Sequence, residues 1–395
     1  MHSDFFGYLD AFERNRDVAH MRFDAIPMES IERIQKTDTF EDRVERMEPV
    51  IFEAQASLST FPAPRVDRWY KLRIVEKDGI PARRYSANNN DGEDSSIMIE
   101  PMDGRTTQFR DLHRMVSLDG LADSTQDDLV KLLTPIKYGR HLAVYEVGQG
   151  SCSAVLDKNL VPMLYFDLGG GCFGNASTYP TNFRPCFTST PPVLLSHWDI
   201  DHWISGDKFS DAQNSPWIVP RQSFGPFHMK FAQKLLSNNK LHIWPNSLRS
   251  LNTPFGVIYK MPSCSNRNHS GLILVANVGH INNKILVLCP GDAKYAKIPV
   301  CATGNIDGLI VTHHGGLYHG DNPPVAKNAS SCIAYSYGSN NTYGHPHART
   351  VTKHQKYGWT MRRDSISGNQ TIPILVSIPS NPLCNLNFCS LKIVQ

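Results

Sequence analysis

The sequence predicts a mixed α/β protein with an N-terminal α/β region over residues 1–138 and a larger domain over residues 139–395. From residue 139 onward, short apolar runs alternate with polar or glycine-rich turns, the pattern of buried strands that carry loops at their ends. Residues 29–58 instead place apolar side chains three and four positions apart, which predicts helix. A content of 41% hydrophobic and 19% charged residues is typical of a folded globular protein.

In the N-terminal region, residues 68–87 (RWYKLRIVEKDGIPARRYSA) predict two strands around a Lys-Asp-Gly turn. Residues 65–84 contain seven Lys and Arg against three Asp and Glu, with Trp69 and Tyr70 interleaved. Such a segment could help to hold a nucleic acid, and the simpler alternative is a solvated hairpin. The segment STQDDLVKLL predicts a short capped helix, and no group of residues in this region indicates chemistry.

Composition bounds the class of protein. The net charge of +3 gives no whole-protein argument for a nucleic-acid partner. Nine cysteines without a CxxC pair favour reduced thiols over a disulfide framework. The N-terminus lacks the basic and apolar parts of a signal peptide, and no apolar run approaches the roughly 20 residues that span a bilayer. We therefore expect a cytoplasmic protein without a membrane segment.

In the larger domain, each predicted strand leads into residues that can carry chemistry. An insertion over residues 204–250 contains a predicted helix, HMKFAQKLLSNN, and two more strands are expected at residues 373–378 and 388–395. The strands and the segments that follow them are HLAVYEV before GQGS, PMLYFD before LGGG, PVLLS before HWDIDH, the hairpin of LILVANV and KILVLC before PGD, GLIVT before HHGG, and CIAYSYG before SNNTYGHPH.

The segment HWDIDH has the strongest metal-binding pattern. His197, Asp199 and Asp201 alternate, so in extended chain neighbouring members of this series point the same way. A turn at Asp201 could aim Asp201 and His202 at a second ion. Imidazole and carboxylate groups suit Zn²⁺, Mn²⁺ or Fe²⁺. The alternative is a polar surface loop.

Further candidate ligands follow later strands. Asp292 follows KILVLC, His313 and His314 follow GLIVT with two glycines behind them, and His345 and His347 lie in TYGHPH. The simpler interpretations are a turn aspartate, structural histidines and a surface turn. Each group alone is weak, but their joint occurrence after successive strands favours one common site.

Two glycine-rich strand ends complete the pattern. Asp167 precedes three glycines, and we expect it to orient the ligand loop from behind. The glycines of residues 148–150 could cradle a phosphate, although one GxG is weak evidence.

The order of these motifs resembles that of the metallo-β-lactamase superfamily, and most of all the hydrolase domain of the ComEC/Rec2 competence proteins. The phosphorylcholine esterases are also similar. The resemblance covers about 210 residues, from His141 to about Arg349. It implies an αββα sandwich with two divalent metal ions, Zn or Mn, at one edge. The membrane channel of the competence proteins has no counterpart here.

The resemblance also implies ligand roles. His197 and Asp199 would bind the first metal, and Asp292 would bridge both metals. The superfamily commonly has a second histidine where this chain has Asp199, which makes the first site oxygen-rich and leaves Mn²⁺ as plausible as Zn²⁺. The ligands implied for the second metal are Asp201, His202 and His314.

Such a centre predicts a metal-dependent hydrolase. Two metals that hold a hydroxide could cleave a phosphodiester, so we expect a nuclease acting on DNA or RNA. The alternatives are a small-molecule phosphodiesterase, acting on cyclic nucleotides or choline-phosphate esters, and a partner-binding module with a vestigial metal site. A defence-type bacterial effector would combine the nuclease activity with a protein partner on the N-terminal region. Asp201, His313 and His345 are the expected catalytic residues, and the expected supporting or substrate residues are Asp167, His347 and Asn341.

Overall fold

A computed structural model of the chain divides into two compact units. The first, here called the barrel unit, consists of Met1–Leu121, Gln222–Ser237 and Ser265–Arg267. The second, the two-sheet unit, consists of Ala122–Arg221, Asn238–Cys264 and Asn268–Gln395. The residues that the structure describes are 4–15, 17–36, 40–59, 64–86, 91–136, 139–280, 283–317, 321–368 and 370–372.

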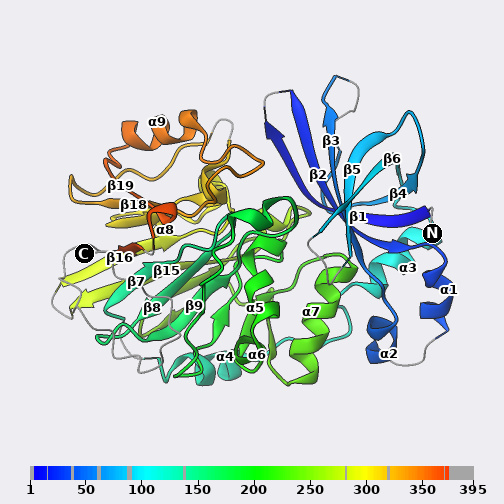
Figure 1. The fold of residues 1–395 in the computed structure, drawn as a ribbon. Coiled ribbons are helices and arrows are strands. Elements are labelled where there is room, and N and C mark those ends of the chain that lie inside the picture. Colours follow the sequence, from blue (N-terminus) through cyan, green and yellow to red (C-terminus); the bar gives the residue numbers. More distant parts are fainter. Residues whose placement is uncertain are drawn as a thin grey trace. The chain divides into compact units, whose positions relative to one another are not determined.

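The barrel unit is built on a closed antiparallel barrel with the strand order β1-β2-β3-β5-β6-β4 (Figure 1). Its interior is filled by aromatic and aliphatic side chains such as Phe5, Phe23 and Leu72. The strands are β1 (Asp4–Asn15), β2 (Val18–Pro27), β3 (Val50–Ser57), β4 (Trp69–Ile74), β5 (Ile80–Ser86) and β6 (Glu93–Pro101). The helices of the unit are α1 (Ser30–Gln35), α2 (Phe40–Glu45), α3 (Thr107–Met115) and α7 (Pro226–Ser237).

The barrel corrects two sequence predictions. Helix is confirmed only in the first part of residues 29–58, because β3 runs through the β-branched and aromatic residues that follow Val50. Two strands are confirmed within residues 68–87, but they form no hairpin, since β6 pairs with both. Trp69 and Tyr70 are buried, so they cannot stack on a nucleic-acid base. That segment therefore gives no binding surface of the expected kind.

A buried ionic cluster lies inside the barrel unit, where the sequence indicated no chemistry. The Asp10 carboxylate accepts hydrogen bonds from Arg22 Nε at 2.8 Å and Arg267 Nη2 at 2.7 Å. His228 Nε2 lies 3.0 Å from the same carboxylate. The other nitrogen of His228 lies 2.8 Å from Asp24 Oδ2. Asp24 also accepts from the backbone N–H of Phe227, and so caps the first turn of α7. Burial would raise the pKa of Asp10, but His228 and both arginines hold it well below its usual range.

The two-sheet unit contains two seven-stranded sheets, so the chain is a mixed α/β protein with several sheets, as predicted. The first sheet has the order β12-β11-β10-β9-β8-β7-β20, and the second has the order β13-β14-β15-β16-β17-β18-β19. The strands of the first are β7 (His141–Val144), β8 (Cys152–Leu156), β9 (Pro162–Leu168), β10 (Val193–Leu194), β11 (Trp217–Pro220), β12 (Leu241–Trp244) and β20 (Gln370–Ile372). Those of the second are β13 (Ser250–Thr253), β14 (Gly256–Lys260), β15 (Leu272–His280), β16 (Asn283–Cys289), β17 (Gly308–Ile310), β18 (Cys332–Tyr335) and β19 (Met361–Asp364).

The two sheets share one hydrophobic core, which takes Leu142 and Phe166 from the first sheet and Leu274 and Val287 from the second. On the other face of the second sheet, side chains such as Leu309 pack in a separate core. This alternation follows from the two-residue period of a strand. Each strand predicted from residue 139 to residue 335 is confirmed. The helices are α4 (Gln126–Leu133), α5 (Ile204–Lys208), α6 (Ser210–Gln213), α8 (Val300–Thr303) and α9 (Ala348–Lys356).

Three helices bear on the sequence predictions. The helix predicted in STQDDLVKLL is confirmed as α4, where Thr125 and Asp128 form a reciprocal cap. Leu129 and Leu133 pack into the shared core, so residues 122–138 group with the two-sheet unit. The helix predicted in the insertion is confirmed as α7 and groups with the barrel unit. The strands expected at residues 373–378 and 388–395 lie outside the described residues, and no described helix has the length and apolar content to span a bilayer.

Candidate metal centre

The sheet topology brings the candidate ligands to one edge of the two-sheet unit. Strand β10 is parallel to β9, and β16, β17 and β18 are mutually parallel. Parallel strands end at the same edge of a sheet, so the segments after them gather there. Asp167 ends β9, HWDIDH follows β10, Asp292 follows β16, and His313 and His314 follow β17.

The ligand atoms form two overlapping triads. The first contains His197, His202 and Asp292, and the second contains Asp201, His202 and His314. Within each triad one nitrogen or oxygen atom per residue lies within 4.8 Å of the others. The third acidic residue among the predicted ligands, Asp199, lies beside the first triad, with its Oδ2 3.3 Å from His197 Nε2. All six residues predicted as metal ligands therefore lie together.

Asp292 belongs to the first triad and also lies near His314 of the second. Its Oδ2 is 3.8 Å from His197 Nε2, whereas its Oδ1 is 3.2 Å from His202 Nε2 and 4.0 Å from His314 Nε2. Asp201 Oδ2 lies 3.2 Å from His314 Nε2. The two oxygens of Asp292 thus face different histidines, an arrangement that suits a carboxylate shared between two ions.

The tautomer of His314 follows from its hydrogen bond. Its Nδ1 lies 2.9 Å from the backbone carbonyl of Ser336, and a carbonyl only accepts, so Nδ1 carries the proton. In the neutral ring Nε2 is then the nitrogen with the lone pair, and it lies 3.2 Å from Asp201 Oδ2. The buried Nε2 atoms of His197, His202 and His314 make no hydrogen bond with any described residue. Buried polar atoms ordinarily find partners, so these three nitrogens suit divalent metal ions that would displace any proton they carry.

One buried carboxylate orients two of these histidines. Asp167 Oδ2 accepts from His202 Nδ1 at 2.8 Å and from Ser196 Oγ at 2.9 Å, and Oδ1 accepts from the Ser196 backbone N–H at 2.7 Å. Because Ser196 Oγ donates its proton to Asp167, it accepts from His197 Nδ1, 2.9 Å away. Such outer partners fix the ring and the tautomer of a metal-binding histidine. Asp167 lies where the sequence predicted it, and Ser196 was missed although it directly precedes His197.

The glycine-rich segments pack against the ligand loop. A Cβ atom on Gly150 or Gly169 would overlap the backbone carbonyl of Asp201. That carbonyl accepts from the N–H groups of Ser151, at 3.0 Å, and Gly170, at 3.1 Å. The close approach of two backbone segments explains why glycine is needed at these positions, so the glycines are no evidence for a phosphate site.

The electrostatic field of the site favours cations. Burial would lower the pKa of His202, but Asp292 and Asp167 reverse this and raise the pKa well above its usual range. Burial would likewise raise the pKa of Asp292, and the neighbouring histidines hold it well below its usual range. The carboxylates therefore attract positive charge into a buried space, and metal ligands must give up protons when they bind an ion.

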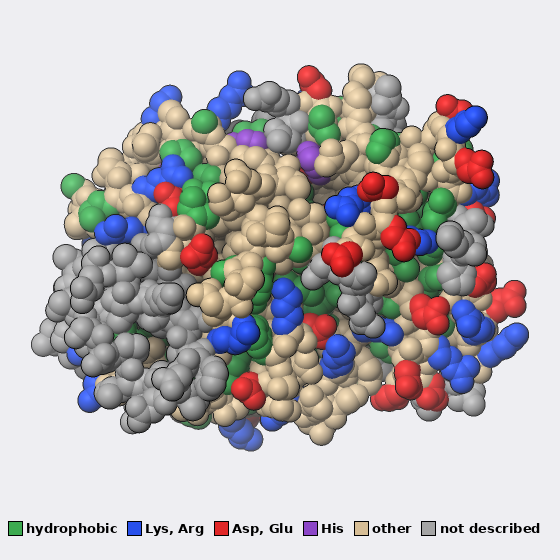
Figure 2. All heavy atoms as spheres, in the orientation of Figure 1, with side chains coloured by type: hydrophobic (Ala, Val, Ile, Leu, Met, Phe, Trp, Pro, Cys, Tyr) green, Lys and Arg blue, Asp and Glu red, His purple; other side chains and the backbone are tan. Residues whose placement is uncertain are grey.

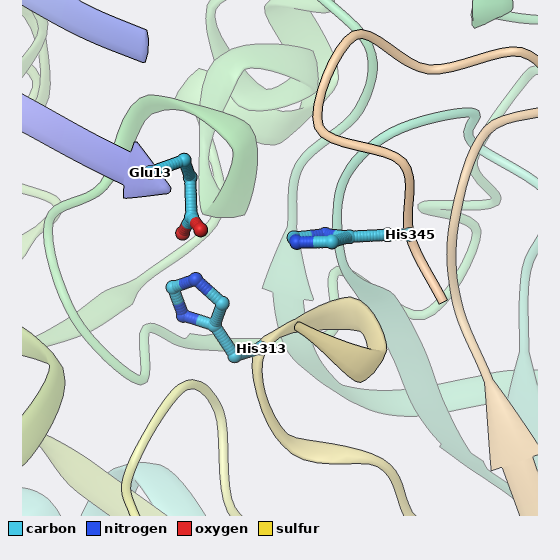
Figure 3. A group of neighbouring side chains, drawn as sticks. All are labelled: Glu13, His313 and His345. Carbon is cyan, nitrogen blue, oxygen red and sulfur yellow. The ribbon is translucent and has the colours of Figure 1, made fainter. Parts of the chain in front are cut away.

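His313 and His345 face each other beside the triads, with ring centroids 5.7 Å apart (Figure 3). Glu13, also drawn there, belongs to the barrel unit. His313 Nδ1 lies 2.9 Å from Asp292 Oδ2, and its side chain is 27% exposed. His313 and His314 both have φ of 52°, a backbone strain that is typical of functional sites.

The remaining predicted residues support His345. Gln149 Nε2 lies 3.2 Å from His345 Nδ1, and this contact was missed although Gln149 lies in the GQGS motif. Asn341 Nδ2 donates to the carbonyl of His345 at 2.7 Å, and its Oδ1 accepts from the N–H of the same residue at 3.0 Å. Asn341 therefore stabilises the backbone of the loop that carries His345. The ring of His347 lies 5.5 Å from that of His345.

Neither a protein-family model nor a curated protein sequence matches the chain. Among solved structures, the chain is similar to the Zn²⁺-bound PqqB of Methylobacterium extorquens, with 10% sequence identity and a TM-score of 0.33. The match covers 59% of this chain and 99% of that one. A TM-score of 0.33 is too low to establish a common fold, so the chemistry of the chain has to be argued from its own residues.

Proposed function

We propose that the two-sheet unit is an αββα sandwich of the metallo-β-lactamase type. We also propose that it is a metal-dependent phosphodiesterase that cleaves DNA or RNA. The observation that carries the proposal is the convergence of three buried imidazole Nε2 atoms, none with a hydrogen bond to a described residue, on the carboxylates of Asp201 and Asp292. A partner-binding role for the N-terminal region stays a prediction.

In this proposal six residues hold two divalent ions. Asp292 would serve both ions, because its two oxygens face different histidines. When bound, the ions lower the pKa of water and neutralise charge on phosphoryl oxygens. The residues that would hold them are His197, Asp199, Asp201, His202, Asp292 and His314.

The other residues have orienting and proton-transfer roles in this proposal. Asp167 and Ser196 keep the rings of His197 and His202 in the ligating tautomer. His313, partly exposed and held by Asp292, donates a proton to the leaving oxygen. His345, held by Gln149, binds a non-bridging phosphate oxygen.

A substrate panel tests the proposal. The purified chain is analysed for bound metal and incubated with Mn²⁺ or Zn²⁺ and plasmid, single-stranded DNA, RNA or bis-p-nitrophenyl phosphate. We expect cleavage of at least one polymer and loss of turnover in Asp292→Asn with the fold intact by circular dichroism. Asp307→Asn is the matched control, because Asp307 pairs with Lys327 at 2.8 Å outside the triads.

Two outcomes would contradict the proposal in different ways. Cleavage of the small ester without any polymer would identify a small-molecule phosphodiesterase. Absence of metal, together with unchanged behaviour of Asp201→Ala/His202→Ala, would exclude both enzymes and leave a vestigial site.

A further inference from the structure

One face of α9 is basic. Arg349, Lys353 and Lys356 stand at positions i, i+4 and i+7, which share a face of an α-helix, and the helix contains no acidic residue. Arg349 and Lys356 are exposed, and Lys353 is half-buried, with its Nζ donating to the carbonyl of Asp321. Figure 2 shows separate Lys and Arg side chains in the part of the two-sheet unit where Figure 1 places α9. We call these three residues the basic face.

The basic face begins beside the candidate metal centre. The N–H of His347, the residue before α9, donates to the carbonyl of Gly315 at 3.0 Å. Thr350 Oγ1, in the first turn, donates to the carbonyl of Gly316 at 2.9 Å. Gly315 and Gly316 directly follow His314, so the first turn of α9 is fixed to the loop that carries a predicted ligand.

Helix stability does not explain the basic face. Lys353 and Lys356 lie in the last turn of α9, where positive charge complements the helix dipole. Arg349 lies in the first turn, where the same dipole disfavours it. Neither Arg349 nor Lys356 forms an ion pair with a described residue, whereas Arg105, Arg114 and Lys327 all do. Arg349 therefore has a charge that costs helix stability and forms no ion pair with a described residue, which leaves it available to an external anion.

We infer that the basic face of α9 binds the phosphate backbone of a nucleic-acid substrate whose scissile phosphate lies at the metal centre. The inference rests on the proposed function and names the surface that its polymeric substrate would follow. Seven residues of α-helix rise about 10 Å, so Arg349 and Lys356 together reach well beyond a single phosphodiester. A small ester held at the triads would not contact both of them, which makes the basic face useful only to a polymer.

The charge-reversal variant Arg349→Glu/Lys356→Glu tests this inference on the full chain. We expect kcat/KM for a fluorescent single-stranded 20-mer to fall at least tenfold at about 0.1 M salt. Turnover of bis-p-nitrophenyl phosphate should change less than twofold. Loss of two phosphate contacts should also reduce the slope of log affinity against log salt by about 1.4, since each contact contributes roughly 0.7 for a single strand. Arg349→Gln/Lys356→Gln should give the same slope change with a smaller loss of affinity.

The matched control is Lys158→Glu/Lys284→Glu. Both lysines are exposed. Lys158 precedes β9 and Lys284 is the second residue of β16, so each lies at the end of its strand opposite to Asp167 or Asp292. Its change in net charge equals that of the α9 variant. Wild-type cleavage of the 20-mer by the α9 variant, or an equal loss in the control, would overturn the inference.

A failure of the proposed function would be distinguishable from a failure of this inference. If the wild-type chain cleaves neither the polymer nor the small ester, the proposed function fails, and fluorescence anisotropy with the same 20-mer still measures binding. Weaker binding by the α9 variant alone would then support the basic face as a nucleic-acid surface. Equal binding by the wild type, the variant and the control would contradict it.

Discussion

The chain buries two clusters of histidine and aspartate, one in each unit, and their partners differ. In the barrel unit, Asp10 is neutralised by two arginines, and both nitrogens of His228 face carboxylates. In the two-sheet unit, the described groups within ion-pair distance of Asp292 are all histidines.

This difference separates a structural cluster from a metal site. Arginine carries a permanent charge and cannot coordinate a metal through a lone pair, so a cluster that contains it is already balanced. With His228 protonated, Asp10, Asp24 and Asp67 are matched by three cations, since Arg267 Nε lies 3.1 Å from Asp67. Histidine can lose its proton and bind an ion with the same nitrogen. A buried His-Asp cluster without arginine can therefore exchange the protons of its histidines for metal ions.

The largest effect is expected when the balanced cluster is broken. Asp10→Asn removes the buried carboxylate that Arg22, Arg267 and His228 all face, which should lower the free energy of unfolding by about 3–5 kcal/mol in a urea titration. The control is Asp4→Asn, because the ion pair of Asp4 with Arg73 is exposed and should contribute about 1 kcal/mol or less. Equal losses in the two variants would show that the barrel cluster is not balanced as described.

The second effect is the response to metal. Saturating Zn²⁺ or Mn²⁺ at about 100 times its Kd should raise the free energy of unfolding by about 2.7 kcal/mol, and a chelator should reverse the change. Asp292→Asn should abolish this response, and Asp10→Asn should keep it. Metal stabilisation that survives in Asp292→Asn would place the ions elsewhere.

A smaller effect is expected at Ser196. Ser196→Ala removes the hydroxyl that accepts a hydrogen bond from His197 Nδ1. Isothermal titration should therefore show metal affinity reduced about 10- to 100-fold. Ser153→Ala, at a buried serine in β8 whose hydroxyl has no hydrogen bond to a described residue, should leave affinity unchanged. An unaltered affinity in Ser196→Ala would mean that the serine only fills space.

The smallest effect is the pH dependence of the barrel cluster. Burial would lower the pKa of His228, but Asp10 and Asp24 raise it above its usual value. The folded state then keeps a proton that the unfolded chain has lost, so the free energy of unfolding should fall as pH rises above about 6.5, by up to about 1.4 kcal/mol per pH unit. His228→Gln should reduce this slope, and the part that remains comes from His202, whose pKa the carboxylates of Asp292 and Asp167 also raise. His20→Gln should keep it, because burial lowers the pKa of His20.

The sequence predicted which side chains would gather at one edge of the two-sheet unit, because that signal is local. Asp292 and His314 each directly follow an apolar strand, and parallel strands bring such ends together. The supporting residues were harder to find. Gln149 and His345 are in contact although almost 200 residues separate them in the sequence. The role of Ser196 becomes visible only from its hydrogen bond to Asp167.

The barrel was not predictable from local pattern. Residues 50–57 have apolar spacing that fits helix, yet pairing with β2 and β5 makes them a strand, because tertiary pairing overrides propensity. The ionic cluster joins Asp10 to Arg267 and His228, and no motif links residues so far apart. Long-range neutralisation leaves no signature in a single sequence.

The discontinuous barrel unit has a consequence for how the protein is made. Asp10 and Asp24 emerge early from the ribosome, whereas the cations that balance them, His228 and Arg267, are encoded far downstream. A fragment that stops at Leu121 would bury carboxylates without those counter-charges. A barrel made from that fragment alone would lack two of its balancing cations, so experiments on the two-sheet unit should retain the whole chain.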